Sequence, residues 1–232
     1  MNIRVFVLAA ALASVGTLGA FAQQAGVAVP SDVHPVSGRK YAQVMSAAGA
    51  AWLDRPERIE EEQPDRALDV LKIAKGAVVA DVGAGSGYMT AKLASRVGAN
   101  GTVYAVDIQP EMLRLLGLRM KSDNITNVIP VQGEVDNPKL PAATLDLELM
   151  VDVYHEFAAP QTMLRHLRAA LKPDGRLVLL EYRKEDPSIP IRPDHKMSVA
   201  EAKQELEAEG FKLSQVNESL PRQHILVFTR RD

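Results

Sequence analysis

The stretch Asp81-Val82-Gly83-Ala84-Gly85-Ser86-Gly87 decides the fold of this chain. It begins within residues 77–82, a short apolar run with β-branched residues, which is typical of a parallel strand buried on both faces. After it, Met89, Leu93 and Val97 recur at helical spacing. Because glycine has no Cβ and accepts positive φ, a glycine-rich turn lets the backbone approach a ligand closely. The segment therefore predicts a strand, a ligand-binding turn and a helix.

The same alternation of strand and helix patterns continues along the chain. Strand-like runs occupy residues 102–107, 127–132, 145–151, 176–182, 212–217 and 224–229, and helical patterns occupy 110–121 and 160–171. Ser198-Val199-Ala200-Glu201 is a capping box that opens one more helix, which Gly210 ends. Strands that alternate with helices imply a parallel sheet. The short connection Leu220-Pro221-Arg222 makes the last two strands antiparallel.

Length and composition limit the classes of function. The chain has 232 residues, 47% of them hydrophobic and 24% charged, which suits one globular domain. Its formal net charge of -2 lacks the basic excess of a nucleic-acid binder, so no nucleic-acid partner is expected. It contains no cysteine, which excludes disulfides, cysteine-bound zinc and a thiolate nucleophile. Any binding or catalysis is therefore expected to use oxygen and nitrogen groups.

The first 22 residues are predicted to be a signal peptide. Arg4 provides a positive start, residues 5–20 are almost wholly apolar, and Ala20-Phe21-Ala22 resembles a cleavage site. The alternative is an uncleaved anchor that tethers the chain to a membrane, because the apolar run approaches the roughly 18 residues needed to span one. The polar pair Gln23-Gln24 favours cleavage after Ala22. We therefore expect an exported protein, periplasmic or secreted.

Beyond the signal, the chain divides into two further parts. Residues 23–54 are rich in Ala, Gly, Pro and Ser, and they are interpreted as a linker followed by a lid-like segment. Residues 55–232 form the main domain. Within it Tyr88 stands where a dinucleotide-binding G-x-G-x-x-G motif needs its third glycine, which favours a ligand without a pyrophosphate. Asp107 ends the second strand, where its carboxylate can accept hydrogen bonds from both hydroxyls of a ribose.

These residues resemble a known family. Residues 79–87 resemble motif I of class I S-adenosylmethionine-dependent methyltransferases, and Asp107 matches the ribose-binding acid of that family. The resemblance runs from about Arg55 onward and includes Gly133-Glu134 and the segments 147–157 and 171–177. It implies an α/β fold with a Rossmann-like, doubly wound seven-stranded sheet, mostly parallel with the last strand antiparallel. The cofactor, S-adenosylmethionine, would lie across the carboxyl ends of the first strands.

The resemblance also implies a set of cofactor contacts. They are Asp81 near the amino group, Gly83, Ala84, Gly85 and Gly87 along the methionine portion and ribose, Asp107 at the ribose hydroxyls, Ile108 at the adenine face, Glu134 and Val135 at the adenine edge, and Asp152 after the fourth strand. Two alternatives stay open. The glycines can form a tight turn without a ligand, and Glu134 can be a solvated loop acid.

Methyl transfer from a sulfonium needs alignment of the acceptor and exclusion of water more than it needs a base. Where a base helps, His155 is the candidate, because an imidazole titrates near neutral pH. Its alternative role is to pack under the loop, and the neighbouring Tyr154 is expected to fill the core. The histidines show no ligand spacing typical of a metal site, so no metal is predicted.

Two other functions are compatible with parts of the pattern. A non-catalytic S-adenosylmethionine-binding protein would keep the glycine turn and Asp107 but lack an acceptor site. A nicotinamide-dependent oxidoreductase shares the strand, the turn and the distal acid, whereas Tyr88 and residues 171–175 disfavour it. We expect a small-molecule acceptor rather than a protein, methylated at oxygen, nitrogen or carbon. The basic loop 183–196 forms either a rim for an anionic acceptor or a solvated face. The acceptor's identity and the oligomeric state are not set by the sequence.

Overall fold

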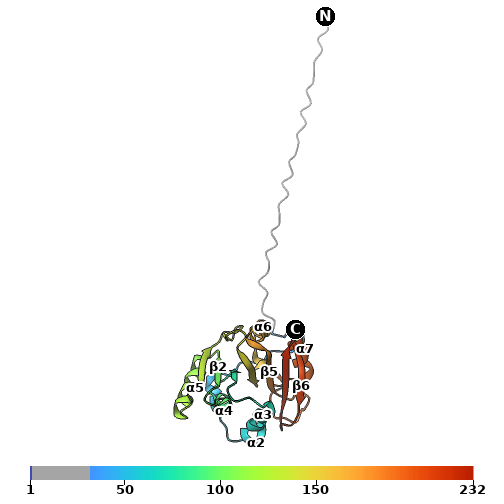
Figure 1. Cartoon of the computed structure of the whole chain (residues 1–232). Helices are drawn as coiled ribbons and strands as arrows, with labels where there is room; N and C mark the ends of the chain where they lie inside the picture. Colours follow the sequence, from blue (N-terminus) through green and yellow to red (C-terminus); the bar gives the residue numbers. More distant parts are fainter. Residues whose placement is uncertain (2–31, 232) are drawn as a thin grey trace. The chain divides into compact units, whose positions relative to one another are not determined.

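The computed structural model describes residue 1 and residues 32–231 (Figure 1). The predicted signal peptide, apart from Met1, and the first part of the predicted linker, 23–31, lie outside the described residues. Among the described helices, none combines the length and apolar character needed to cross a bilayer.

Residues 32–231 contain seven strands in one sheet, in the order β3-β2-β1-β4-β5-β7-β6. Strand β7 runs antiparallel to both of its neighbours, and the other pairs are parallel. This confirms the predicted Rossmann-like doubly wound sheet. The strands are β1 (Val78–Val82), β2 (Thr102–Asp107), β3 (Val128–Gln132), β4 (Leu145–Val151), β5 (Leu171–Tyr182), β6 (Phe211–Asn217) and β7 (Gln223–Arg230).

Three short helices precede β1, and four longer helices lie between strands. The helices are α1 (Ala50–Leu53), α2 (Arg58–Glu62), α3 (Pro64–Leu71), α4 (Tyr88–Val97), α5 (Pro110–Ser122), α6 (Pro160–Ala170) and α7 (Val199–Ala208), with 3-10 turns η1 (Ala47–Gly49), η2 (Tyr154–Glu156) and η3 (Pro193–His195). The predicted capping box opens α7, where the Ser198 side chain accepts a hydrogen bond from the Glu201 amide and the Glu201 side chain accepts one from the Ser198 amide.

One strand boundary differs from the prediction. Strand β5 begins at Leu171 rather than at residue 176, because Leu171 already pairs with Leu145 before the register shifts. Gly175 lies within this extension, where a Cβ would stand 2.7 Å from the Leu145 carbonyl oxygen. The glycine allows the two backbones to approach, so the chain passes from α6 into the sheet without a separate loop.

The side chains of β5 show how both faces of the sheet are covered. Leu177 and Leu179 belong to a core cluster with residues of α6 and α7. Val178 and Leu180 belong to a second cluster with residues of α3 and α4. Because successive strand residues point to opposite faces, these helices form two layers around the sheet (Figure 1). Helix α5 packs through Leu116 against β2 and α4.

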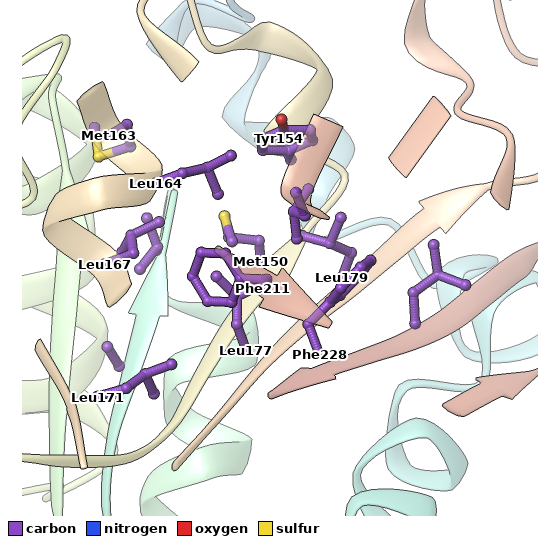
Figure 2. Packing of buried hydrophobic residues seen from close by; sticks show 14 of the residues in the cluster. Met150, Tyr154, Met163, Leu164, Leu167, Leu171, Leu177, Leu179, Phe211 and Phe228 are labelled. Carbon is purple, nitrogen blue, oxygen red and sulfur yellow. The ribbon is translucent and has the colours of Figure 1, made fainter. Parts of the chain in front are cut away.

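Figure 2 shows the α6 and α7 side of the core, where Leu164 and Leu167 of α6 lie near Met150 and Phe211. Tyr154 belongs to the same cluster and is fully buried, which confirms its expected place in the core. Since Tyr154 begins the turn η2, the core fixes the backbone from which the next residue, His155, extends.

The described part of the predicted linker is bound to this domain through Arg39. Its guanidinium donates two hydrogen bonds of 3.0 Å to Glu205 of α7, and both side chains are buried. The same guanidinium donates a 2.9 Å bond to the carbonyl of His155. One buried arginine therefore joins the segment before α1, the last helix and the turn that carries His155.

We predict that Arg39→Ala lowers the free energy of unfolding by about 3–5 kcal/mol, because it leaves the Glu205 carboxylate buried without its cation. Urea denaturation of the full chain measures this. The exposed pair Arg114–Glu111 provides the control, and Arg114→Ala should cause no measurable loss. Equal stability of Arg39→Ala and the wild type would contradict a stabilising role for the buried pair.

Stability should also depend on pH through Glu148, which is fully buried in β4. Among the described residues neither of its carboxyl oxygens has a hydrogen-bond partner, and burial raises its pKa well above the ordinary 4.5. Because the pKa of Glu148 is raised in the folded state, the folded state binds its proton more tightly than the unfolded state does. The stability that this proton contributes is fully present below the unfolded pKa and is lost as pH rises through the folded pKa. We predict that Glu148→Gln removes this loss, which amounts to at most about 1.4 kcal/mol per pH unit.

Urea denaturation from about pH 5 to about pH 8 tests the effect of Glu148. Wild type should become less stable relative to Glu148→Gln as pH rises. The exposed Glu111→Gln is the control and should follow the wild-type slope. Parallel stability curves for wild type and Glu148→Gln would show that the buried carboxyl does not titrate differently on folding.

Candidate functional site

The candidate site lies where the carboxyl ends of three parallel strands meet. Strand β1 pairs with β2 on one side and β4 on the other, so the segments that follow them share one edge of the sheet. A cavity of about 170 Å³ opens there. Seven of the predicted cofactor residues line it, namely Gly83, Gly85, Asp107, Ile108, Glu134, Val135 and Asp152.

The turn after β1 requires glycine for backbone reasons. Gly83 has a φ of 78° and Gly85 a φ of 54°, in the left-handed region. A Cβ on Gly83 would lie 2.4 Å from Cγ2 of Val153, and one on Gly85 would lie 2.7 Å from Cδ1 of Leu53. Both neighbours line the cavity, so the bare glycine backbone forms part of its wall.

Asp107 is held against this turn by backbone amides. Its Oδ2 accepts a 2.9 Å hydrogen bond from the Gly85 amide, and its Oδ1 accepts a 2.8 Å bond from the Gln109 amide. Burial raises the pKa of Asp107, and the amide hydrogen bonds oppose that shift. The apolar side chain of Ile108, next in the chain, is 38% exposed and also lines the cavity. The cavity therefore places a fixed carboxylate beside an apolar surface.

Asp152 has an unused acceptor in the cavity wall. Its φ is 53°, and its Oδ2 accepts a 2.7 Å hydrogen bond from the Gln223 side chain. Its Oδ1 is buried and has no hydrogen-bond partner within residues 32–231. Burial first, and then the charges of Glu62 and Glu181, raise the pKa of Asp152 well above its ordinary value. A positively charged or hydrogen-bonding ligand group would satisfy this oxygen.

Three predicted residues do not line this cavity. Asp81 is buried below it and accepts a 2.6 Å hydrogen bond from the Thr90 hydroxyl, and burial raises its pKa to about 6. Ala84 and Gly87 complete the turn and lead into α4. Glu134 does line the cavity, but its side chain is 57% exposed and pairs with Lys139 at 2.6 Å. Both the ligand contact and the loop-acid interpretation of Glu134 stay open.

A second cavity of about 600 Å³ adjoins the first. The two share lining residues, which are Val44, Met45, Leu53, Val151, Asp152 and Glu156. Beyond this shared wall the second cavity is lined largely by polar side chains, which include those of His155, Tyr182 and His195. The arrangement provides two adjoining spaces with a common wall, one at the glycine turn and one at η2.

His155 lies in the wall of the second cavity with both ring nitrogens engaged. Its Nδ1 is 2.5 Å from Oε2 of Glu181, and its Nε2 is 3.1 Å from Nδ1 of His195. Burial lowers the pKa of His155, but the charge and hydrogen bond of Glu181 outweigh burial, so the pKa lies above its ordinary value. Burial and the neighbouring His155 lower the pKa of His195. Burial raises the pKa of Glu156 to about 7.

Basic side chains of the loop 183–196 are paired with acidic side chains of the same domain, which favours the solvated-face interpretation over an anion-binding rim. Arg183 binds Glu218 and Arg192 binds Asp194, each at 2.6 Å. Lys184 pairs with Glu201. Of the residues in this loop, His195 contributes instead to the cluster around His155. Its role was not evident in the sequence, because His155 and His195 are 40 residues apart.

Residues within 43–53 line both cavities, and they belong to the segment predicted to be lid-like. The Gln109 side chain donates a 2.9 Å hydrogen bond to the Met45 carbonyl and accepts a 3.0 Å bond from the Ala47 amide. At the other end, Arg58 donates a 2.9 Å bond to the Leu53 carbonyl. These contacts bring Val44, Met45 and Leu53 into the cavity walls; no local sequence signal marked them.

Comparisons with known proteins agree with this geometry. Residues 79–175 match the family model described as "Methyltransferase domain". The chain is 34% identical over 122 residues to the ubiquinone/menaquinone biosynthesis C-methyltransferase UbiE of Methylococcus capsulatus, an alignment that covers 50% of this chain and 47% of that protein. It is 30% identical over 118 residues to the protein of the same name from Citrobacter koseri, with the same coverage.

The fold extends the similarity beyond that alignment. A crystal structure of a SAM-dependent methyltransferase from Aquifex aeolicus superimposes with a TM-score of 0.76 at 27% identity, covering 81% of this chain and 100% of that chain. The chain spans about half the length of the curated relatives it matches. The matched domain, the sheet order and the glycine turn with its acid are features that this chain shares with class I S-adenosylmethionine-dependent methyltransferases.

Proposed function

We propose that this protein transfers a methyl group from S-adenosylmethionine, bound in the cavity at the glycine turn, to a small molecule bound in the adjoining cavity. The observation that carries the proposal is the shared wall between the two cavities, with Asp107 fixed in the first by the Gly85 amide. Because the two cavities adjoin, a donor bound in one and an acceptor bound in the other lie close together, so the methyl group has only a short distance to travel.

The residues of the first cavity fit the cofactor. The Asp107 oxygens retain lone pairs that can accept hydrogen bonds from ribose hydroxyls, and Ile108 offers an apolar surface for an adenine ring. The buried, unpaired Oδ1 of Asp152 suits the ammonium group of the methionine portion. When bound, the cofactor supplies a methyl group on a positively charged sulfur, which is already activated for displacement.

The protein's own contribution is to orient the partners and to exclude water. Residues Met45 and Leu53 belong to the segment that lines both cavities, and both contribute apolar surface to the common wall. Closing that wall over two reactants replaces water by side chains and holds the acceptor in line with the methyl group. This function needs no catalytic base. The assignment of His155 as a base stays a prediction, since Glu181 and His195 already engage its two nitrogens.

For the acceptor we propose a small molecule that is methylated at oxygen, nitrogen or carbon. The second cavity is lined by both apolar and polar side chains, including Ile191 and Tyr182. The relatives named as quinone-biosynthesis C-methyltransferases make a quinol ring a reasonable first acceptor to test. The proposed place of action is outside the cytoplasm, after export directed by residues 1–22, with membrane tethering by an uncleaved segment as its alternative.

We predict that the full chain binds S-adenosylmethionine with micromolar affinity and that Asp107→Ala weakens this binding by roughly tenfold to a hundredfold, because two charge-assisted hydrogen bonds are lost. Isothermal titration calorimetry measures both proteins. Exposed Asp123→Ala, at the end of α5 and outside the cavity, should bind like the wild type.

The same titration separates the alternatives. Binding of NADH in preference to S-adenosylmethionine would support the oxidoreductase and overturn this proposal. Binding of S-adenosylmethionine without methyl transfer to any of a panel of quinols, phenols and amines would support the non-catalytic binding protein.

We predict that Gly83→Ala destabilises the chain by roughly 1–3 kcal/mol and weakens cofactor binding, because alanine resists the positive φ and its Cβ would collide with Val153. Thermal unfolding and calorimetry measure the two effects. The matched control is Gly117→Ala in α5, where a Cβ meets no atom within 4 Å and alanine should stabilise the helix by up to about 1 kcal/mol. A Gly83→Ala variant as stable as wild type would show that the turn does not require glycine.

A further inference from the structure

A cluster of three potential metal ligands lies in the second cavity, and the proposed methyl transfer assigns no metal to it. The cluster consists of the side chains of His155, Glu156 and His195, each of which offers one ligand atom. These three ligand atoms lie within 4.8 Å of one another. Two imidazoles and one carboxylate form a donor set that binds divalent transition metals and leaves positions open for another ligand. We infer that this cluster is a binding site for a divalent transition-metal ion such as Zn²⁺.

The spacing of the ligand atoms is close to what such an ion requires. Ligand bonds of about 2.0–2.2 Å place neighbouring donor atoms about 3.0–3.6 Å apart. His155 Nε2 and His195 Nδ1 are 3.1 Å apart, and Oε1 of Glu156 is 3.8 Å from the same His195 nitrogen. A rotation of the Glu156 side chain would complete the set. Without an ion, the contact between the two imidazoles is an ordinary hydrogen bond.

Glu181 supports His155 as a metal ligand. Its carboxylate lies 2.5 Å from Nδ1 of His155 and is itself fully buried, and its other oxygen accepts a 3.1 Å hydrogen bond from the Tyr154 amide. A carboxylate there keeps the proton on Nδ1, so the lone pair of Nε2 faces His195. Histidine ligands of metals are commonly held in this way by a carboxylate on the far nitrogen.

The charges around the cluster also favour a cation. Glu181, Glu156 and Asp152 all act electrostatically on His155. Three arginines line this cavity, and each is already paired with an acid: Arg192 with Asp194, and Arg55 and Arg58 with Glu62. Two imidazole donors argue against Mg²⁺ and Ca²⁺, which prefer oxygen ligands. The site therefore suits a transition-metal ion such as Zn²⁺, and this proposal differs from the expectation of no metal that rested on histidine spacing in the sequence.

The location suggests what the ion would bind. The cluster lines the second cavity, and Glu156 also lines the first. An open position on the ion would therefore face the acceptor, and an oxygen donor such as a hydroxyl or carboxylate is the acceptor class that fits. This assignment of an acceptor class rests on the proposed function, whereas the metal site itself does not.

Calorimetric titration of the chelator-treated full chain with ZnCl₂ tests the site. We expect one equivalent to bind with micromolar or tighter affinity. His195→Ala removes a ligand from a partly exposed turn and should weaken binding at least tenfold. Glu181→Gln should weaken it roughly tenfold to a hundredfold. The exposed His166→Ala is the matched control and should bind as the wild type does. Co²⁺ absorption in the visible range gives a second readout, which should change in His195→Ala and not in His166→Ala.

Three results would overturn the metal site: no saturable binding of Zn²⁺, equal binding by His195→Ala and wild type, or a preference for MgCl₂ over ZnCl₂. Circular dichroism of each variant establishes that it is folded, and His195→Ala remains informative if Glu181→Gln does not fold. Titration of the same metal-free protein with S-adenosylmethionine separates the two proposals, because cofactor binding without Zn²⁺ binding removes the metal site and leaves the methyltransferase proposal intact.

Discussion

The hydrogen bond from the Gly85 amide to the Asp107 carboxylate joins the ends of two neighbouring strands, and the rest of the site is arranged around it. It forms because β1 and β2 are parallel, so that their carboxyl ends meet at one edge. The Gly83 and Ala84 amides both donate to the Val106 carbonyl, which holds the turn against β2. A ligand at this edge therefore meets a backbone whose position is set by the sheet.

Buried carboxyl groups gather near the same edge, and they are held in different ways. Asp107 is stabilised by two backbone amides, whereas Asp81 has the Thr90 hydroxyl and Glu181 has the Tyr154 amide and His155. Asp152 keeps one oxygen without a partner among the described residues. Burying a charged or polar group without a partner costs free energy, so an unpaired acceptor beside a cavity indicates a place where ligand binding can recover that cost.

Local sequence patterns were sufficient to predict the strands of the sheet and the cavity at the glycine turn, but not the contact between His155 and His195. Six of the seven strands were placed to within a residue at each end, since buried strands, glycine turns and the capping box at Ser198 are local features. The start of β5 was missed because Leu171 joins the sheet through its pairing with Leu145, a contact between distant residues. Asp107 was recognisable because it ends a strand beside a glycine turn. The proximity of His155 and His195 depends on two loops folding together, and no spacing along the chain encodes it.

Arg39 shows why the fold and the site cannot be separated in this protein. Its guanidinium binds Glu205 of α7 and the His155 carbonyl at the same time, and the Ala42 amide donates to that carbonyl as well. The segment that leads to the cavity wall at Val44 and Met45 therefore also fixes the backbone of η2. A shift in this segment would move the wall of both cavities and the His155 side chain together. The wall of both cavities and the backbone of the histidine cluster are thus connected through one buried ion pair.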